Sequence, residues 1–266
     1  MADDPLARPV LLALYHAGEL SDQPATLRYR IERQDGGWIA LAPGRPPYGP
    51  ARLEEVFTFL EWRATEDLLA SAGAVFLHAA GLRVGRRNVL LVGDSGAGKS
   101  TLAAFLLTRG HLAWGDDLVR FAPEERRFSA VPRSWKVDAK TLENLYLLSR
   151  LGADGAQGMV LASNVAYVSP ATLRRRWRAP DGPVHIVVLL DAASHKGPAA
   201  LERASDGAAG VTAARMLIGA DVTRPGSEQA DLMVRVLEAM REVRAYRARG
   251  ADPAGLAVAL EREAAA

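Results

Sequence analysis

The stretch that decides the fold runs from Val89 to Leu102 and reads VLLVGDSGAGKSTL. Its first four residues are an apolar run of strand length, the pattern Gly-x-x-x-x-Gly-Lys-Ser follows at residues 93–100, and a helix-forming segment continues to Gly110. A strand, a glycine-rich turn and a helix start are the context in which this pattern forms a phosphate-binding loop. Glycines let the backbone curl so that several N–H groups point at one anion, and the positive end of the helix dipole points the same way. The predicted loop, a Walker A motif, consists of Gly93, Asp94, Ser95, Gly96, Ala97, Gly98, Lys99, Ser100 and Thr101.

Two side chains of this loop add chemistry of their own. Lys99 can place a full charge at the β- and γ-phosphates of a nucleotide, and the Ser100 hydroxyl can ligate Mg²⁺. We therefore expect ATP and Mg²⁺ as cofactors. The alternative is a glycine-rich turn that fits the pattern by chance, and it requires strand, loop, lysine, serine and helix to agree by accident.

Two adjacent acids, Asp116 and Asp117, follow a β-like run at residues 111–115. A strand that ends in acids directly after the helix of a phosphate-binding loop is typical of a parallel neighbour strand in an α/β sheet, where ligands collect at the carboxyl ends of strands. One carboxylate can hold Mg²⁺, directly or through water, and the other can accept a proton from an attacking hydroxyl. We expect both acids to belong to the site; the alternative is a solvated turn or a helix cap.

A histidine stands upstream of the loop. His78 lies near the end of an apolar run at residues 74–80, and a predicted hairpin turn at residues 85–87 separates that run from the strand that feeds the loop. This spacing places His78 near a strand end close to the loop. On spacing alone, a single histidine in such a position is more often structural than catalytic.

The composition excludes several classes of protein. The chain has 266 residues, 49% of them apolar, a formal net charge of +2 and no cysteine, so disulfides, thiolate catalysis and cysteine-ligated metal sites are excluded. It contains no uncharged apolar run long enough for a membrane span and no secretion-signal pattern at residues 1–4, so we expect a cytoplasmic protein without a membrane partner. We do not expect nucleic acid as a partner because the basic residues are scattered, and the cluster Arg174–Arg178 is interpreted as a solvated helix face. Arg133 and Lys136 could contact a phosphate or an acidic substrate, with ordinary surface cations as the alternative.

The first part of the chain differs from the rest. Alternating residues around Gly36-Gly37 predict a β-hairpin over residues 27–41, and an imperfect apolar stripe predicts a helix over residues 53–72. We expect a small β-rich region closed by a helix at residues 1–72 and a P-loop catalytic domain at residues 73–266.

The remaining pattern favours an α/β fold. Residues 184–191 form a nearly continuous apolar run, as in a strand buried on both faces. Apolar periodicity predicts helices over residues 228–243 and 253–263, with a short edge strand between them at residues 243–249.

These motifs carry a resemblance to a known family. Residues 93–100, the triplet Arg109-Gly110-His111 and the segment Asp116–Val119 together resemble the catalytic core of the HPr kinase/phosphorylase family, and Leu77-His78-Ala79 matches the place where that family carries a histidine. The match covers roughly residues 75–120. It implies the nucleotide-binding fold that this family shares with phosphoenolpyruvate carboxykinase, and an activity that phosphorylates a protein serine with ATP and Mg²⁺.

The resemblance also implies roles for single residues. Asp116 or Asp117 acts as general base, and the pair organises the metal together with Ser100. In the assignment that we expect, Ser100 and Asp117 hold Mg²⁺, Asp116 takes the proton, and His78 and Lys99 assist at the reacting phosphate; the two aspartate roles can be exchanged.

The chain departs from the bifunctional members of the family. Thr101 stands where those enzymes usually carry glutamate, and the later segment Glu-x-Arg-Gly-x-Gly is missing from the sequence. The chain therefore resembles the shorter HPr-kinase-like proteins, some of which phosphorylate a peptide serine.

The expected function is thus a Mg²⁺·ATP-dependent serine kinase with a protein or peptide substrate. The alternatives are an ATP-binding switch or ATPase module and a small-molecule kinase. Members of this family assemble into oligomers, so the resemblance leaves open whether this chain forms a homo-oligomer.

Overall fold

The computed structural model describes residues 28–70, 75–131, 133–138, 159–162, 165–191, 197–205, 207–218 and 226–266. Contacts between residues divide the chain into two compact units: Met1–Ser71 with Pro132–Thr172, and Ala72–Val131 with Leu173–Ala266. We call these the first and the second unit and describe each by itself. The expected division into a region at 1–72 and a catalytic domain at 73–266 stays a prediction.

The first unit begins with an antiparallel sheet and a helix. The sheet has the order β1-β2-β3, and helix α2 packs against it through Val56 and Leu60, which form a small buried core with Ala40. The predicted hairpin and helix are confirmed, although the helix ends before residue 72. The elements are β1 Arg30–Gln34, β2 Gly37–Leu41, β3 Tyr48–Ala51 and α2 Leu53–Leu69.

A second antiparallel sheet completes this unit, with the order β10-β12-β11. Its elements are β10 Trp135–Asp138, β11 Met159–Ala162 and β12 Val165–Val168, followed by the short helix α6 Pro170–Leu173. The helix ends at Leu173, so the interpretation of Arg174–Arg178 as a helix face is wrong. In that segment, which belongs to the second unit, Trp177 is buried and Arg178 forms an isolated bridge with Ala113.

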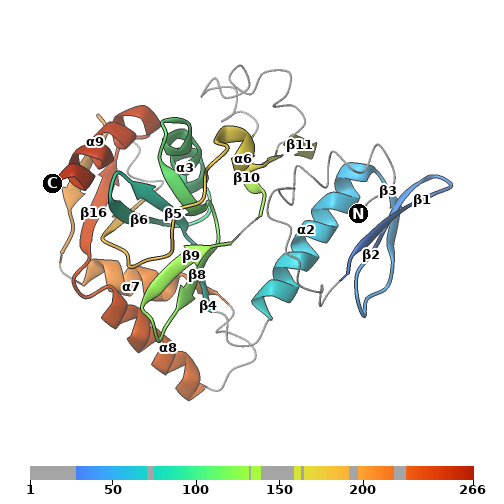
Figure 1. The fold of residues 1–266 in the computed structure, drawn as a ribbon, viewed down its shortest axis with the longest axis horizontal. Helices are drawn as coiled ribbons and strands as arrows, with labels where there is room; N and C mark the ends of the chain where they lie inside the picture. The colour runs from blue at the N-terminus through green and yellow to red at the C-terminus, as the bar shows by residue number, and fades with distance from the viewer. Residues whose placement is uncertain are drawn as a thin grey trace. The chain divides into compact units, whose positions relative to one another are not determined.

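The second unit is built on a mixed six-stranded sheet with the order β14-β16-β13-β6-β5-β7 (Figure 1). Strands β16, β13 and β6 run parallel to one another, whereas β14 pairs antiparallel with β16, and β5 pairs antiparallel with both β6 and β7. Its strands are β5 Ala80–Val84, β6 Arg87–Val92, β7 Leu112–Gly115, β13 Ile186–Leu189, β14 Ala200–Arg203 and β16 Arg244–Arg249. The α/β prediction is confirmed in this coarser form, a mixed α/β chain with a central mixed sheet.

Two predicted strand positions in this sheet are wrong. Strand β7 is not the neighbour of β6, because β5 folds back from β6 and occupies that place. Strand β16 is not an edge strand, because β14 pairs with its outer side. Local apolar patterns predict that a strand exists but not which strand pairs with it.

Helices cover the sheet at two places. Helix α3 packs with α9 against β5, β7 and β14, whereas α7 packs against β13 and β16 with α8 beside it (Figure 1). The helices are α3 Lys99–Thr108, α7 Ala208–Arg215, α8 Gly226–Ala239 and α9 Pro253–Ala265. Asp252 caps α9 by accepting hydrogen bonds from the backbone N–H groups of Ala254 and Gly255, with Pro253 at the first helical position.

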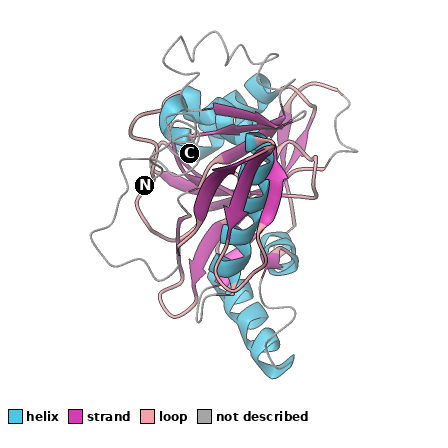
Figure 2. Cartoon of the chain, turned by 90° about the vertical axis from the view of Figure 1, so that its right-hand side faces the viewer, coloured by secondary structure: helices cyan, strands magenta, loops and turns pink. Residues whose placement is uncertain are grey.

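Figure 2 shows the described helices and strands of the chain from a second direction. None of the described helices has the length and apolarity needed to span a membrane.

A second, four-stranded antiparallel sheet lies in the same unit, with the order β15-β4-β8-β9. Its strands are β4 Val75–Leu77, β8 Val119–Ala122, β9 Arg127–Ala130 and β15 Leu217–Ile218. The rings of Phe121 in β8 and Phe128 in β9 stack with their centroids 4.7 Å apart, and Trp114 of β7 stacks on Phe128 from the six-stranded sheet. Two crossings between the sheets lead directly from strand to strand, from β4 to β5 and from β7 to β8, whereas the chain reaches and leaves β15 through α7 and α8.

Gly81 lies where the two sheets meet, and its replacement will destabilise the protein. A Cβ atom on Gly81 would lie 2.9 Å from Trp114 Cε3 and 2.9 Å from Val119 Cγ2, and both side chains are buried. Overpacking of this kind costs about 1–3 kcal/mol. We expect Gly81→Ala to lower the free energy of unfolding by that amount in urea titrations. Gly226→Ala, where no atom lies within 4 Å of the new Cβ, is the matched control; equal effects of the two substitutions would contradict the prediction.

A carboxylate on α9 joins that helix to the end of α3 and gives the fold a pH dependence. Glu261 accepts from Arg109 Nε at 2.9 Å and Nη2 at 2.7 Å, and its Oε1 lies 2.8 Å from His111 Nε2. Chiefly because of the bond from Arg109, the pKa of Glu261 falls from 4.5 to about 2. A lowered carboxylate pKa stabilises the fold above the ordinary pKa, and this stabilisation is lost as the pH falls toward the lowered value.

We therefore expect Arg109→Gln to be less stable than the wild type above pH 4.5, with a difference that shrinks as the pH falls toward 2. The difference should stay within about 1 kcal/mol because the pair is partly exposed. Urea unfolding between pH 3 and 7 measures it, with the exposed Arg175→Gln as control. A difference that is constant over this range would rule out the ion pair as its source.

Candidate active site

The two crossings between the sheets bring His78 and the acidic pair together. β4 pairs with β8, with Leu77 opposite Val119, and β5 pairs with β7, with Gly81 opposite Gly115. The connections between these strands therefore run side by side, and one contains His78 whereas the other contains Asp116 and Asp117. His78 is held there by a 2.7 Å hydrogen bond from its backbone N–H to the carbonyl of Met216.

The glycine-rich loop lies at the same edge of the sheet. β6 and β7 both run antiparallel to β5, so their carboxyl ends point the same way, although they are not neighbours. The loop joins β6 directly to α3, and Gly98 in a left-handed conformation (φ 90°) precedes the helix. A Cβ on Gly93 would lie 2.2 Å from the carbonyl oxygen of Leu190, so glycine is required where the loop leaves the sheet.

Lys99 is buried under this loop, with 5% of its surface exposed. Its ammonium donates to the carbonyl oxygens of Gly93 at 2.8 Å and Asp94 at 3.1 Å, and lies 3.2 Å from His78 Nε2. Burial lowers the pKa of Lys99, and the negative charges of Asp117, Asp94 and Asp116 oppose this shift. The ammonium is thus held among groups that a bound phosphate can replace.

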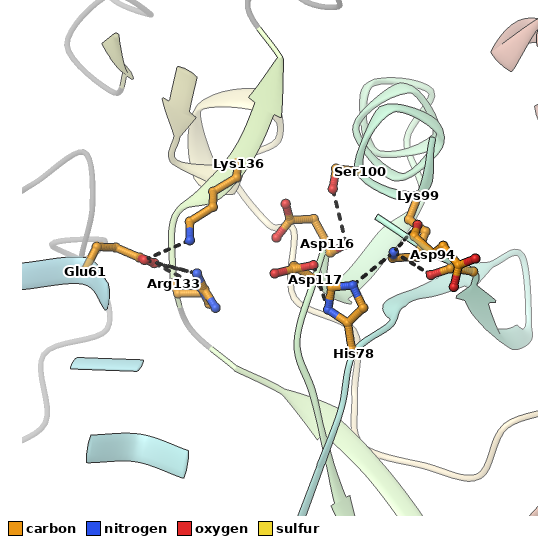
Figure 3. Close-up of polar contacts among 10 residues, drawn as sticks. Glu61, His78, Asp94, Lys99, Ser100, Asp116, Asp117, Arg133 and Lys136 are labelled. Atoms are coloured by element: carbon orange, nitrogen blue, oxygen red, sulfur yellow. Dashed lines mark hydrogen bonds and ion pairs between the residues drawn. The ribbon is translucent and has the colours of Figure 1, made fainter. Parts of the chain in front are cut away.

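His78 connects Lys99 to the acidic pair. Its Nδ1 lies 3.0 Å from Asp117 Oδ1 on one side, and its Nε2 faces the ammonium on the other (Figure 3). Because an ammonium only donates and a carboxylate only accepts, these partners assign a neutral ring with the proton on Nδ1. The contacts form a continuous chain Asp117–His78–Lys99 at the edge of the loop.

The two aspartates differ in access. Asp117 has 33% of its side chain exposed, whereas Asp116 is buried, with 1% exposed, and its backbone carbonyl accepts from Ser100 Oγ at 3.4 Å. Asp117 can therefore meet a group that arrives from solvent, and Asp116 lies on the side of Ser100.

The oxygen atoms around the loop suit Mg²⁺. The carboxylates of Asp94, Asp116 and Asp117 act on the single ammonium of Lys99, which leaves an excess of negative charge, and the Ser100 hydroxyl adds a neutral oxygen. Within the described part of the chain, no group of three or more His, Asp or Glu side chains could hold a metal ion. Mg²⁺ bound with ATP needs only one or two carboxylates, because phosphates and water supply the other ligands. The residues present therefore fit a Mg²⁺ that arrives with a nucleotide.

A cavity of about 230 Å³ adjoins the loop on the side of α9. Gly96, Gly98 and Thr101 form one wall and Gly250 and Leu256 part of the other. Asp191, at the carboxyl end of β13, also lines it. No sequence motif assigns Asp191 a role, although its position directly after the apolar residues 184–190 is a usable signal for a ligand site. The cavity is smaller than the roughly 300–1,000 Å³ of typical ligand pockets, so it fits part of a nucleotide.

Arg133 and Lys136 belong to the first unit and have a partner there. Arg133 Nε and Nη2 donate to the two carboxylate oxygens of Glu61 at 3.0 and 3.1 Å, and Lys136 Nζ lies 3.4 Å from Glu61 Oε2 (Figure 3). Glu61 is 4% exposed, and removing one member of such a buried pair is costly. The Arg133 guanidinium therefore has a structural role, which no local sequence pattern indicates because Glu61 lies 72 positions upstream.

The fold and the site define a mixed α/β protein with a glycine-rich loop between a strand and a helix and an aspartate pair beside it. No protein-family model matches the sequence, and no curated protein matches it. Among solved structures, the chain is similar to the HPr(Ser) kinase/phosphatase from Coxiella burnetii, with 12% identity and a TM-score of 0.36 over 71% of this chain and 89% of that chain. Similarity at this level carries no conclusion about activity, so the function proposed below rests on the geometry of the site.

Proposed function

We propose that the protein is a Mg²⁺·ATP-dependent kinase that transfers the γ-phosphate to a serine hydroxyl of a protein or peptide. The observation that carries the proposal is the chain of contacts Asp117–His78–Lys99 at the edge of the glycine-rich loop. In the proposed mechanism Asp117 accepts the proton and Lys99 binds the phosphate, and His78 contacts both side chains. Phosphoryl transfer needs little more from the protein than positioning and charge neutralisation.

The residues divide the work as follows. The backbone N–H groups of residues 93–98 and the Lys99 ammonium hold the phosphates, with Lys99 giving up the Gly93 and Asp94 carbonyls. The nucleoside end extends past Thr101 into the cavity beside Asp191. When bound, Mg²⁺ neutralises phosphate charge, and Ser100 with one aspartate would hold it.

Of the two assignments that the sequence leaves open, we propose that Asp117 is the base and Asp116 faces the metal. Asp117 is accessible, and its Oδ1 contacts His78 Nδ1. Asp116 is buried, and its backbone carbonyl accepts a hydrogen bond from Ser100. The serine oxygen forms a bond to the γ-phosphorus, the bond to the β-phosphate oxygen breaks, and the serine proton passes to Asp117 while ADP leaves. His78 orients the carboxylate.

Incubation with γ-labelled ATP and Mg²⁺, together with peptides, proteins from an extract and a panel of hydroxylated metabolites, tests this function. Label on a polypeptide serine, absent with Lys99→Ala, is the expected result. Label released only as inorganic phosphate would instead establish an ATPase or switch, and label on a metabolite a small-molecule kinase. Failure to bind ATP would overturn all three.

A further inference from the structure

We propose a second anion-binding site, for a small organic phosphate, at the end of the six-stranded sheet away from the glycine-rich loop. The site is a cavity of about 480 Å³ lined by the β5–β6 turn at Gly85, Arg86 and Arg87, by His111, and by the last turns of α9. Strand β6 begins at Arg87 and ends at Val92 before the loop, which separates the two sites by roughly 17 Å at about 3.3 Å per residue.

The acid that lines the cavity is already neutralised. Glu261 accepts hydrogen bonds from Nε and Nη2 of Arg109 and contacts His111 Nε2, so its negative charge is paired with the positive charge of Arg109. Among the residues that the structure describes, no acidic side chain pairs with Arg86 or Arg87. Arg86 and Arg87, which line the cavity, therefore have guanidinium donors that no described acid occupies.

More positive charge gathers behind them. Burial is the main reason why the pKa of His185 is lowered, and the charges of Arg87, Arg83 and Arg244 lower it further. Each of these three arginines therefore lies close enough to the His185 ring to act on its charge. Glu263, on α9, accepts a hydrogen bond from the Tyr246 hydroxyl through its carboxylate and one from Arg244 through its backbone carbonyl. Arg83, Arg87 and Arg244 therefore contribute positive charge around His185 at this end of the sheet.

The shape and chemistry favour a phosphate on a carbon skeleton. Adjacent guanidinium groups bind phosphate oxygens in pairs of parallel hydrogen bonds. The rest of the lining includes Val84, Ala264 and Ala265, which offer apolar surface to the carbon part. The volume lies within the range of pockets that enclose a small ligand. Binding here requires none of the loop residues, so it is independent of the proposed kinase activity.

Phenyl phosphate, a phosphate on an apolar ring, is the probe. In an NMR titration of the full-length protein, we expect shifts at the amides of Gly85, Arg87 and Ala264 in addition to any shifts in the loop. The double variant Arg86→Gln, Arg87→Gln should weaken the binding measured at these amides by at least about tenfold, because hydrogen bonds to charged groups are lost. The control Arg175→Gln, Arg176→Gln removes the same charge from exposed positions outside the cavity.

Three readings decide the outcome. Shifts confined to residues 93–101, or equal affinity in the two double variants, would overturn the second site. Lys99→Ala should abolish shifts in the loop and leave those at Gly85 and Ala264 unchanged, which separates failure of this site from failure of the kinase proposal. Arg86→Gln alone, in an exposed turn, serves if the double variant does not fold.

Discussion

Replacing Lys99 with alanine will lower the rate of phosphate transfer at least about 100-fold, as expected when one preorganised donor to a developing charge is removed. Lys99 is the only lysine in the loop, it is 5% exposed, and its ammonium lies within 3.2 Å of three acceptors that a phosphate can replace. In a buried environment this charge acts on the phosphate more strongly than it would in water.

The same substitution should leave the fold in place. A buried ammonium is costly to desolvate, which is why burial lowers the pKa of Lys99, and alanine is the best helix former at this first position of α3. We expect a change in Tm of only a few degrees, measured by circular dichroism, beside a large loss of transfer from labelled ATP. Transfer within threefold of wild type in a folded variant would remove Lys99 from the phosphate site.

Asp117→Asn will lower the rate of transfer by about 10²–10⁴-fold, the usual contribution of a general base. Asparagine keeps an oxygen that can accept the bond from His78 Nδ1, 3.0 Å away in the wild type, but it cannot take a proton. The half-saturating Mg²⁺ concentration should therefore change little, because the metal side of the site is left intact.

Asp116→Asn provides the comparison that separates the two roles. If Asp116 faces the metal, this variant should need more Mg²⁺ and recover part of its rate when Mg²⁺ is raised. Asp231→Asn, on the exposed face of α8, is the control for the loss of a carboxylate. The opposite pattern, with a Mg²⁺-rescued Asp117→Asn, would exchange the roles and restore the assignment first expected from the sequence.

Local sequence patterns predicted many of the helices and strands. The apolar run before Gly93 and the helix after Gly98 are both present, as are the first hairpin and helices α2, α8 and α9 near their predicted ranges. These elements depend on residues within one or two turns of each other, so periodicity and capping are enough to find them. The roles of Lys99, Ser100, Asp116, Asp117 and His78 stay predictions.

The pairing of the strands could not be predicted from local sequence patterns. The sequence placed Asp116 and Asp117 at the correct edge for a partly wrong reason, since β5 lies between β6 and β7. Because β5 is antiparallel to both β6 and β7, these two strands run in the same direction, as they would if they were parallel neighbours. The apolar residues of β5 and β7 have the same alternation in either arrangement, so their pattern does not distinguish the two.

By itself, then, the sequence determined the local elements: a strand, a glycine-rich turn with Lys99 and Ser100, and a helix whose start is set by the turn. Only the tertiary structure decided that His78 contacts Asp117 across 39 positions of chain and that Arg109 contacts Glu261 across 152. The physical reason is that each of these contacts depends on which strands and helices pack together. That choice follows from burying apolar surface over the whole sheet, which no short segment encodes.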